Sequence, residues 1–152
     1  MSVSLEKADI SDAQELYDMQ IKSFKALLTR YQDSNSPGAE TIERTFQRMK
    51  DPSTDFYFIS LCGKHIGALR IYSSGELCKL KQIFILPKYQ GYGYAQQAIS
   101  LVESFYPDAG RWELDTILQE EKLCYLYEKM GYKKTGKIEA VKDGMDLVFY
   151  AK

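Results

Sequence analysis

The sequence predicts a mixed α/β fold in which helices cover both faces of a central mixed sheet. Three observations predict it. The unbroken apolar run Ile83–Leu86 is typical of a strand covered on both faces. From Ala95 the apolar residues change to helical spacing, and Pro107 ends that helix. The pair Asp143-Gly144 is a strong hairpin signal, so hairpins and strand-to-helix crossovers occur in one chain.

Composition sets limits on domain number and on partners. A chain of 152 residues is long enough for one domain with a substantial core, and it contains no linker, repeat or low-complexity tract. We therefore expect residues 1–152 to form a single domain. The formal net charge of −1 gives no sign of a nucleic-acid surface or of an anionic-membrane surface, so neither partner is expected.

The cysteines and the single histidine indicate the compartment and argue against a metal. No apolar run approaches the roughly 20 residues that span a bilayer, and the N-terminus has no signal-peptide core. Cys62, Cys78 and Cys124 are scattered and odd in number, which predicts free thiols in a reducing, cytoplasmic setting. His65, near a predicted hairpin, is interpreted as a surface residue, and one histidine excludes a multi-histidine centre. No metal is expected.

The N-terminal segment predicts a strand and then a long helix. Val3–Lys7 alternates apolar and polar residues, as a half-buried strand does. Ser11 is expected to cap a helix, with Gln14 completing a capping box. Apolar positions keep one face of this helix largely hydrophobic as far as Leu28, and the breaker cluster 33–38 follows.

A short helix and a hairpin come next. Residues 40–50 predict the helix, and Asp51-Pro52 ends it. Phe56–Leu61 and Ile66–Tyr72 predict two strands joined by a tight turn at Gly63-Lys64. The cluster 73–75 then turns the chain toward the central strand.

The C-terminal third predicts one more strand, a helix and a closing hairpin. Arg111–Thr116 alternates polar and apolar residues. A helix over about 119–130 is followed by Gly131, placed as a left-handed C-terminal cap. The two strands 133–141 and 145–150 form the hairpin.

The turn between the central strand and the following helix has the composition of an anion site. Gly91 and Gly93 allow backbone N–H groups to point outward, and the helix begins directly after them. A dinucleotide fingerprint would require a third glycine where Gln96 stands, and no Gly-Lys-Ser/Thr triplet follows. The anion is therefore neither a typical dinucleotide nor a P-loop nucleotide.

Two motifs resemble the GNAT superfamily of N-acyltransferases. Gln90-x-x-Gly93-x-Ala95, after a strand that ends at Pro87, resembles the acyl-CoA pyrophosphate loop of that family. The segment Leu126–Tyr132 looks like the family's last helix and the strand that follows it. The two motifs lie on the expected elements, and the order of elements resembles the family over nearly the whole chain.

The resemblance implies a particular sheet and a particular cofactor path. The sheet would be mostly antiparallel, with a V-shaped splay between strands 4 and 5, here Ile83–Leu86 and Trp112–Thr116. The pantetheine arm of acetyl-CoA would enter that gap and pair with the first of these strands. The cofactor-binding residues that the resemblance implies are Phe84, Ile85, Gln90, Gly91, Tyr92, Gly93, Tyr94 and Ala95.

The implied activity is transfer of an acetyl group from acetyl-CoA directly to a primary amine in a ternary complex. Tyr127 matches the family's general-acid tyrosine, which protonates the leaving thiolate. Glu113 is the candidate base; Asp115 lies on the same face of its strand, and both could instead belong to a solvated face. The acceptor would be a small-molecule or peptide amine, and the protein a monomer or homodimer. The acidic residues that would favour a cationic amine are Asp33, Glu113, Asp115, Glu120 and Glu121.

Two departures from the family pattern, at Glu120 and Leu123, leave other functions open, and Gln90 is the less frequent of the two residues that the loop pattern allows. Gln90 stands where arginine is more frequent, Glu120 stands where an asparagine contacts the coenzyme, and Leu123 replaces a small alanine. A non-catalytic acyl-CoA sensor would keep the loop without productive chemistry. A nucleotide-phosphate protein could use the same glycine turn.

Overall fold

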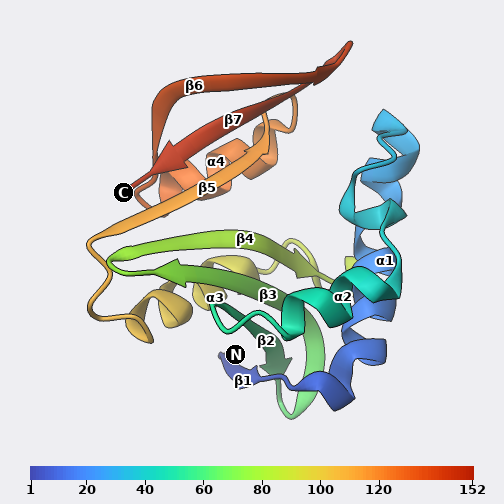
Figure 1. Ribbon diagram of the computed structural model, residues 1–152, viewed down its shortest axis with the longest axis vertical. Helices are drawn as coiled ribbons and strands as arrows, with labels where there is room; N and C mark the ends of the chain where they lie inside the picture. Colours follow the sequence, from blue (N-terminus) through green and yellow to red (C-terminus); the bar gives the residue numbers. More distant parts are fainter.

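One seven-stranded sheet forms the centre of the molecule in the computed structural model, which describes residues 1–152 (Figure 1). Its strand order is β1-β2-β3-β4-β5-β7-β6, and only β4 and β5 are parallel neighbours. The strands are β1 (Val3–Lys7), β2 (Thr54–Leu61), β3 (Lys64–Ser74), β4 (Leu77–Ile85), β5 (Arg111–Ile117), β6 (Lys133–Lys142) and β7 (Met145–Ala151). The helices are α1 (Ala13–Tyr31), α2 (Ile42–Met49), α3 (Tyr94–Ser104) and α4 (Glu121–Lys129), with short 3-10 turns at Ile10–Asp12, Pro37–Ala39 and Pro87–Tyr89.

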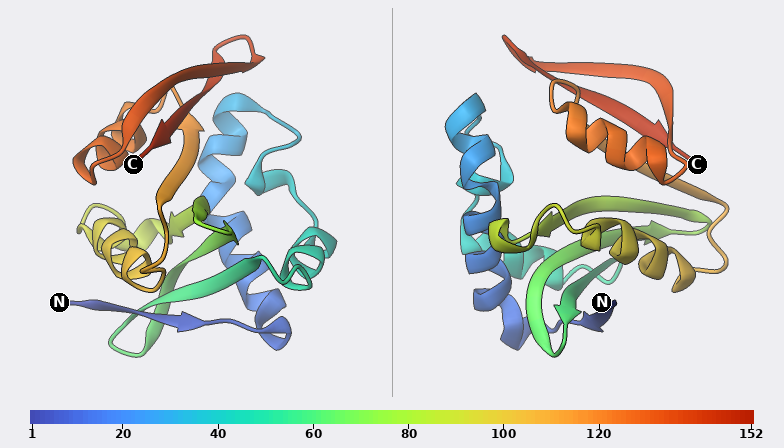
Figure 2. Two further views of the ribbon diagram at one scale, coloured as in Figure 1. Left: turned by 60° about the vertical axis from the view of Figure 1, so that its left-hand side comes forward. Right: turned by 180° about the vertical axis from the view of Figure 1, so that it is seen from behind.

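Helices cover both faces of the sheet, as predicted (Figure 2). The larger core lies on the α3 and α4 side and includes Ile99, Val102 and Cys124. The smaller core lies on the α1 side and includes Leu16 and Met19. Because strand side chains alternate between faces, β2, β3 and β4 contribute to both cores, and the mixed α/β fold class is confirmed.

Strands β4 and β5 diverge soon after they begin. Only Leu77–Lys79 pairs with β5, opposite Arg111–Glu113. Beyond that point β5 pairs with β7 alone, and Figure 1 shows the two strands separating toward α1. The predicted V-shaped splay between strands 4 and 5 is therefore confirmed.

The start of α1 differs from the prediction. Ser11 is not the cap; its backbone N–H donates to Asp9 Oδ1 at 2.9 Å. Asp9 N–H in turn donates to Asp12 Oδ2 at 3.0 Å, which completes a capping box around the 3-10 turn. The helix also runs past the predicted end at Leu28 and stops only where Gln32 takes a left-handed conformation, φ 52°.

The turn between β2 and β3 lies one residue earlier than predicted. Cys62 (φ 52°) and Gly63 (φ 78°) are the two central residues, and positive φ at both is what the favoured hairpin turn requires. Lys64 is already the first residue of β3. Gly131, with φ 95°, follows α4 as the predicted left-handed residue.

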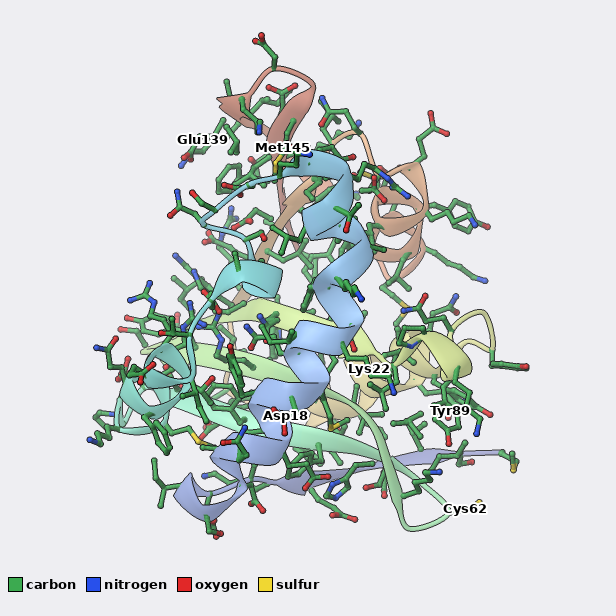
Figure 3. The ribbon with its side chains drawn as sticks, turned by 90° about the vertical axis from the view of Figure 1, so that its right-hand side faces the viewer. Asp18, Lys22, Cys62, Tyr89, Glu139 and Met145 are labelled. Carbon is green, nitrogen blue, oxygen red and sulfur yellow. The ribbon has the colours of Figure 1, made fainter.

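The last turn of α1 is tied to the C-terminal part of the sheet. Arg30 Nη1 and the Tyr31 hydroxyl both donate to Glu120 Oε2 at 2.5 Å, directly before α4. Lys142 Nζ donates to the Gln32 carbonyl at 3.5 Å, and Figure 3 shows Met145 near the same end of α1. Helix α1 therefore bounds the open side of the divergence between β4 and β5.

His65 is held by charged neighbours. Its ring stacks on Phe58, with centroids 3.8 Å apart. Nδ1 lies 2.7 Å from Glu15 Oε2 and Nε2 lies 3.0 Å from Glu6 Oε2. These contacts hold the ring in place, which gives the histidine a structural role.

No helix of the protein is long and apolar enough to cross a membrane, and all three cysteines are free.

Candidate active site

Six consecutive backbone N–H groups, from Gly91 to Gln96, donate no hydrogen bond within the protein. They span the turn after β4 and the first residues of α3. The first turn of any helix leaves N–H groups unpaired, and here no side chain caps them. Together with the positive end of the α3 dipole they form a cradle for an anion.

The two glycines make this cradle accessible. Gly91 (φ 85°) and Gly93 (φ 81°) both take left-handed conformations, which cost other residues about 1–2 kcal/mol each. No heavy atom lies within 4 Å of the position that a Cβ would occupy at either residue. The space in front of the N–H groups is therefore open to a ligand.

Gln90 holds the loop to the end of β4. Its Nε2 donates to the Ile85 carbonyl at 2.8 Å. This bond uses one of the two amide hydrogens that the resemblance would direct to the pyrophosphate. The structure thus gives Gln90 a role in shaping the loop, and the six backbone N–H groups remain the principal donors.

Alternate residues of β4 direct their backbone N–H and C=O groups toward the unpaired edge of the strand. Leu86 N–H donates to the Ile66 carbonyl of β3 at 2.8 Å, so Phe84, two residues earlier, also directs its backbone toward β3. The backbone groups of Ile83 and Ile85 consequently face the divergence. Of the two predicted pairing residues, Ile85 presents its backbone to the divergence and Phe84 presents its backbone to β3, while the Phe84 side chain packs in the core beside α1.

Tyr127 on α4 lies at the other wall of the divergence. Its side chain is only 7% exposed and packs against Tyr132 and Tyr150, with ring centroids 6.3 Å and 6.5 Å away. Its hydroxyl has no hydrogen-bond partner within the protein, and the hydroxyl oxygen keeps some contact with solvent. Burial, and then the charge of Asp115, raises the pKa of Tyr127, so the hydroxyl keeps its proton at neutral pH.

The two candidate bases on β5 have different surroundings. Glu113 is engaged: its carboxylate lies 2.6 Å from Arg111 Nε and 3.9 Å from Lys79 Nζ. Asp115 makes no hydrogen bond or ion pair, and partial desolvation raises its pKa, although Lys81 pulls the other way. Asp115 is exposed to solvent, but protein atoms around it partly desolvate its carboxylate, as in a concave site.

A groove between α1 and the turn after β4 carries two unpaired lysines, Lys22 and Lys25, beside the ion-paired Arg30. It has a volume of about 670 Å³, and Figure 3 shows Lys22 of α1 and Tyr89 of the loop on this flank. Positive charge here strengthens the attraction of the loop for an anion. The lining residues are Lys22, Lys25, Ala26, Thr29, Arg30 and Pro87.

The fold and this geometry match a known family. A family model for the acetyltransferase (GNAT) domain matches residues 26–152. The chain belongs to the GNAT acetyltransferase family. The resemblance that the two motifs indicated is therefore confirmed, and with it the expectation of an acyltransferase of the GNAT type.

Solved GNAT structures share the fold at low sequence identity. An acetyltransferase from Thermus thermophilus matches with a TM-score of 0.76 at 16% identity, over 100% of this chain and 97% of that one. A spermidine N-acetyltransferase from Vibrio cholerae, in complex with CoA and spermine, gives 0.79 at 16%, over 99% and 95%. The ribosomal-protein-S18-alanine N-acetyltransferase from Escherichia coli gives 0.77 at 14%, over 98% and 92%. No curated protein sequence matches significantly.

The structure brings most of the predicted GNAT site together and adds residues that the sequence did not single out. The loop, Tyr127 and the β5 carboxylates lie around one divergence. Glu120, which stands where an asparagine is frequent, binds α1, and Leu123 packs against the larger core. Ile83 was missed because only the strand register shows which backbone groups face outward.

Proposed function

We propose that the protein transfers an acetyl group from acetyl-CoA to a primary amine, with both substrates bound at once. The observation that carries this proposal is the row of six unpaired N–H groups, 91–96, next to the diverging strands. A diphosphate accepts several such donors at a helix N-terminus. The open edge at Ile83 and Ile85 offers the pantetheine amides a strand to pair with. The thioester supplies the acetyl group.

The chain itself would contribute position and protons. Holding amine and thioester in line can supply about 7–11 kcal/mol by removing the entropy of their encounter. The amine nitrogen bonds to the acetyl carbon as the carbon–sulfur bond breaks. A base on β5 takes the ammonium proton before the attack, the thiolate sulfur takes the proton of Tyr127, and the second proton lost by the nitrogen restores the tyrosine.

Within that scheme the geometry supports Tyr127 as the acid and Asp115, in place of Glu113, as the base. Tyr127 has an unpartnered hydroxyl that stays protonated at neutral pH, which a general acid needs. Asp115 is unpaired, and its raised pKa makes it a stronger base than an ordinary aspartate. Glu113 would have to leave two cations before it could accept a proton.

The variant Tyr127→Phe tests the acid. We expect turnover to fall by roughly 10²–10⁴-fold because the thiolate would leave without a proton donor. The dissociation constant of acetyl-CoA, measured by calorimetry, should stay unchanged because the loop is untouched. Tyr125→Phe is the matched control: Tyr125 lies on the same helix and is 67% exposed.

A panel of amines assayed for free-thiol release tests the reaction itself. Turnover of at least one amine, together with loss of rate in Tyr127→Phe but not in Tyr125→Phe, is the expected result. Binding of acetyl-CoA with no turnover of any amine would support the sensor alternative instead. Full activity of Tyr127→Phe at every pH would show that Tyr127 only packs the core.

A further inference from the structure

Arg70 of β3 is a partly buried cation without a counter-ion. Its guanidinium makes no ion pair and no hydrogen bond, and its Nε is wholly buried without a partner. Removing an unpaired charge from water is costly, and such groups in proteins are normally matched by a carboxylate or another acceptor. The Nη groups are not buried in this way, so they remain able to accept an incoming anion.

Two further cations lie near Arg70. Arg44 on α2 and Lys81 on β4 make no ion pair or side-chain hydrogen bond, and each is close enough for its charge and that of Arg70 to affect one another. Burial, with the charges of Arg48 and Arg44, lowers the pKa of Arg70 to about 10, so it stays protonated at neutral pH. Glu40, the acid whose charge acts on Arg70, is already bound to Arg48.

That acid is fixed and cannot turn to Arg70. Glu40 makes a two-pronged pair with Arg48, with both N–O distances 2.7 Å. Gln20 Nε2 donates to the same carboxylate at 2.8 Å. Glu40 and Arg48 therefore form a fixed ion pair with no net charge. Arg70 and Arg44 beside this pair keep their positive charge.

Arg70 lies on the face of the sheet that α1 and α2 cover. Ala68 packs in the smaller core under α1 and α2, so Arg70, two residues on, faces the same side of the sheet. Lys81 is the extra residue of the bulge opposite Arg70, and its charge is felt by Asp115. The charge of Asp115 is felt in turn by Tyr127. These groups make a continuous line from β3 across to α4.

We propose that Arg70, with Arg44 and Lys81, binds an anionic group of the acceptor, so that the preferred substrate is an amine that also carries a carboxylate or a phosphate. This inference rests on the proposed function and names its substrate class. Asp115 would face the amine at one end, and Arg70 would hold the anion at the other. It reverses the expectation from the sequence that acidic residues near the pocket select a purely cationic amine. A guanidinium suits both anions because its planar N–H groups match their oxygens.

Matched acceptors that differ only in the anion test the proposal. The panel pairs each standard L-amino acid with its α-amide, pairs phosphoethanolamine with ethanolamine, and includes spermidine. With acetyl-CoA as donor, we expect an anionic acceptor to exceed its neutral partner by about tenfold or more in kcat/KM. The pair that responds distinguishes a carboxylate from a phosphate.

Variants at Arg70 connect that preference to the site. Arg70→Gln should lower kcat/KM for the anionic acceptor by about 10–100-fold and leave its neutral partner unchanged. Arg70→Lys should recover part of the loss. Lys50→Gln, which removes an exposed and unpaired charge from the end of α2, should keep the full preference. If Arg70→Gln does not fold, Arg44→Gln and Lys81→Met should each reduce the preference.

A binding measurement separates this proposal from the transfer reaction. Calorimetry with N-acetylated L-amino acids and their amides needs no turnover, and the acid should bind the wild type more tightly than Arg70→Gln. Equal rates for acids and amides, or spermidine faster than every anionic acceptor, would overturn the proposal and leave the transferase intact. Arg70-dependent binding of the acid without turnover of any amine would support the anion site and contradict the proposed function.

Discussion

Asp115 and Glu113 show how strand register decides the role of a carboxylate. They are two residues apart on β5 and face the same side. Glu113 lies where β5 still pairs with β4, within reach of Lys79 and Arg111. Asp115 lies just beyond the last β4 pair, where no neighbouring strand brings a cation into contact. A shift of two residues therefore separates a carboxylate engaged in ion pairs from one that is free to accept a proton.

The pH profile of the reaction tests this assignment. Only ionised Asp115 can accept a proton, and its pKa is raised, so kcat/KM should fall as pH drops through that raised value. Asp115→Asn should lower kcat/KM by roughly 10²–10⁴-fold and abolish this acid limb. If Glu113→Gln shows that loss and Asp115→Asn does not, the sequence-based choice of Glu113 was right.

The residue types of the site were predictable, but their partners were not. The two motifs were sufficient to propose Tyr127 and the glycines, whose roles stay predictions. Arg70 gave no signal, because an arginine in a strand becomes notable only when its neighbours are known to lack a carboxylate. Glu120 looked like a lost coenzyme contact, whereas its partners Arg30 and Tyr31 are about ninety residues away in the chain.

At the scale of elements, the loop between β4 and α3 performs its role through backbone shape. Gly93→Val should weaken acetyl-CoA binding by about tenfold or more, because the side chain would project over the N–H groups and strain a left-handed residue. Gly75→Val is the matched control, since Gly75 has φ 61° and equally open surroundings in a turn remote from the loop. Calorimetry gives both dissociation constants. Equal losses of affinity in the two variants would mean that strain alone, and not the loop, was responsible.

Element types were predictable and element ends were less so. Apolar patterns located the helices and most strands because burial of one face determines them, whereas the fully exposed β6 was located by the Asp143-Gly144 turn. Ends depend on local hydrogen bonds that several residues can compete to make. Asp9, and not Ser11, forms the capping bonds, and β4 begins at Leu77, six residues before the apolar run that identified it.

At the scale of the whole molecule, the seven-stranded sheet consists of two parts that are hydrogen-bonded to each other only where β4 and β5 begin. We call these parts the two arms of the sheet. Strands β1 to β4 form one arm and β5 to β7 the other, joined by three residue pairs at the start of β4 and β5. The last turn of α1 bridges the arms through Glu120 and Lys142. This divergence could not be derived from local patterns, because it follows from which strands fail to pair. That residues 1–152 act as a single domain stays a prediction.

Amide hydrogen exchange with and without acetyl-CoA tests the central claim most directly, because it reports on the backbone donors themselves. The unpaired N–H groups of residues 91–96 should exchange quickly in the free protein and become strongly protected when acetyl-CoA binds, together with Ile83 or Ile85. The turn at Gly75 should not change. Saturating acetyl-CoA that leaves residues 91–96 exchanging at their free rates would contradict the account.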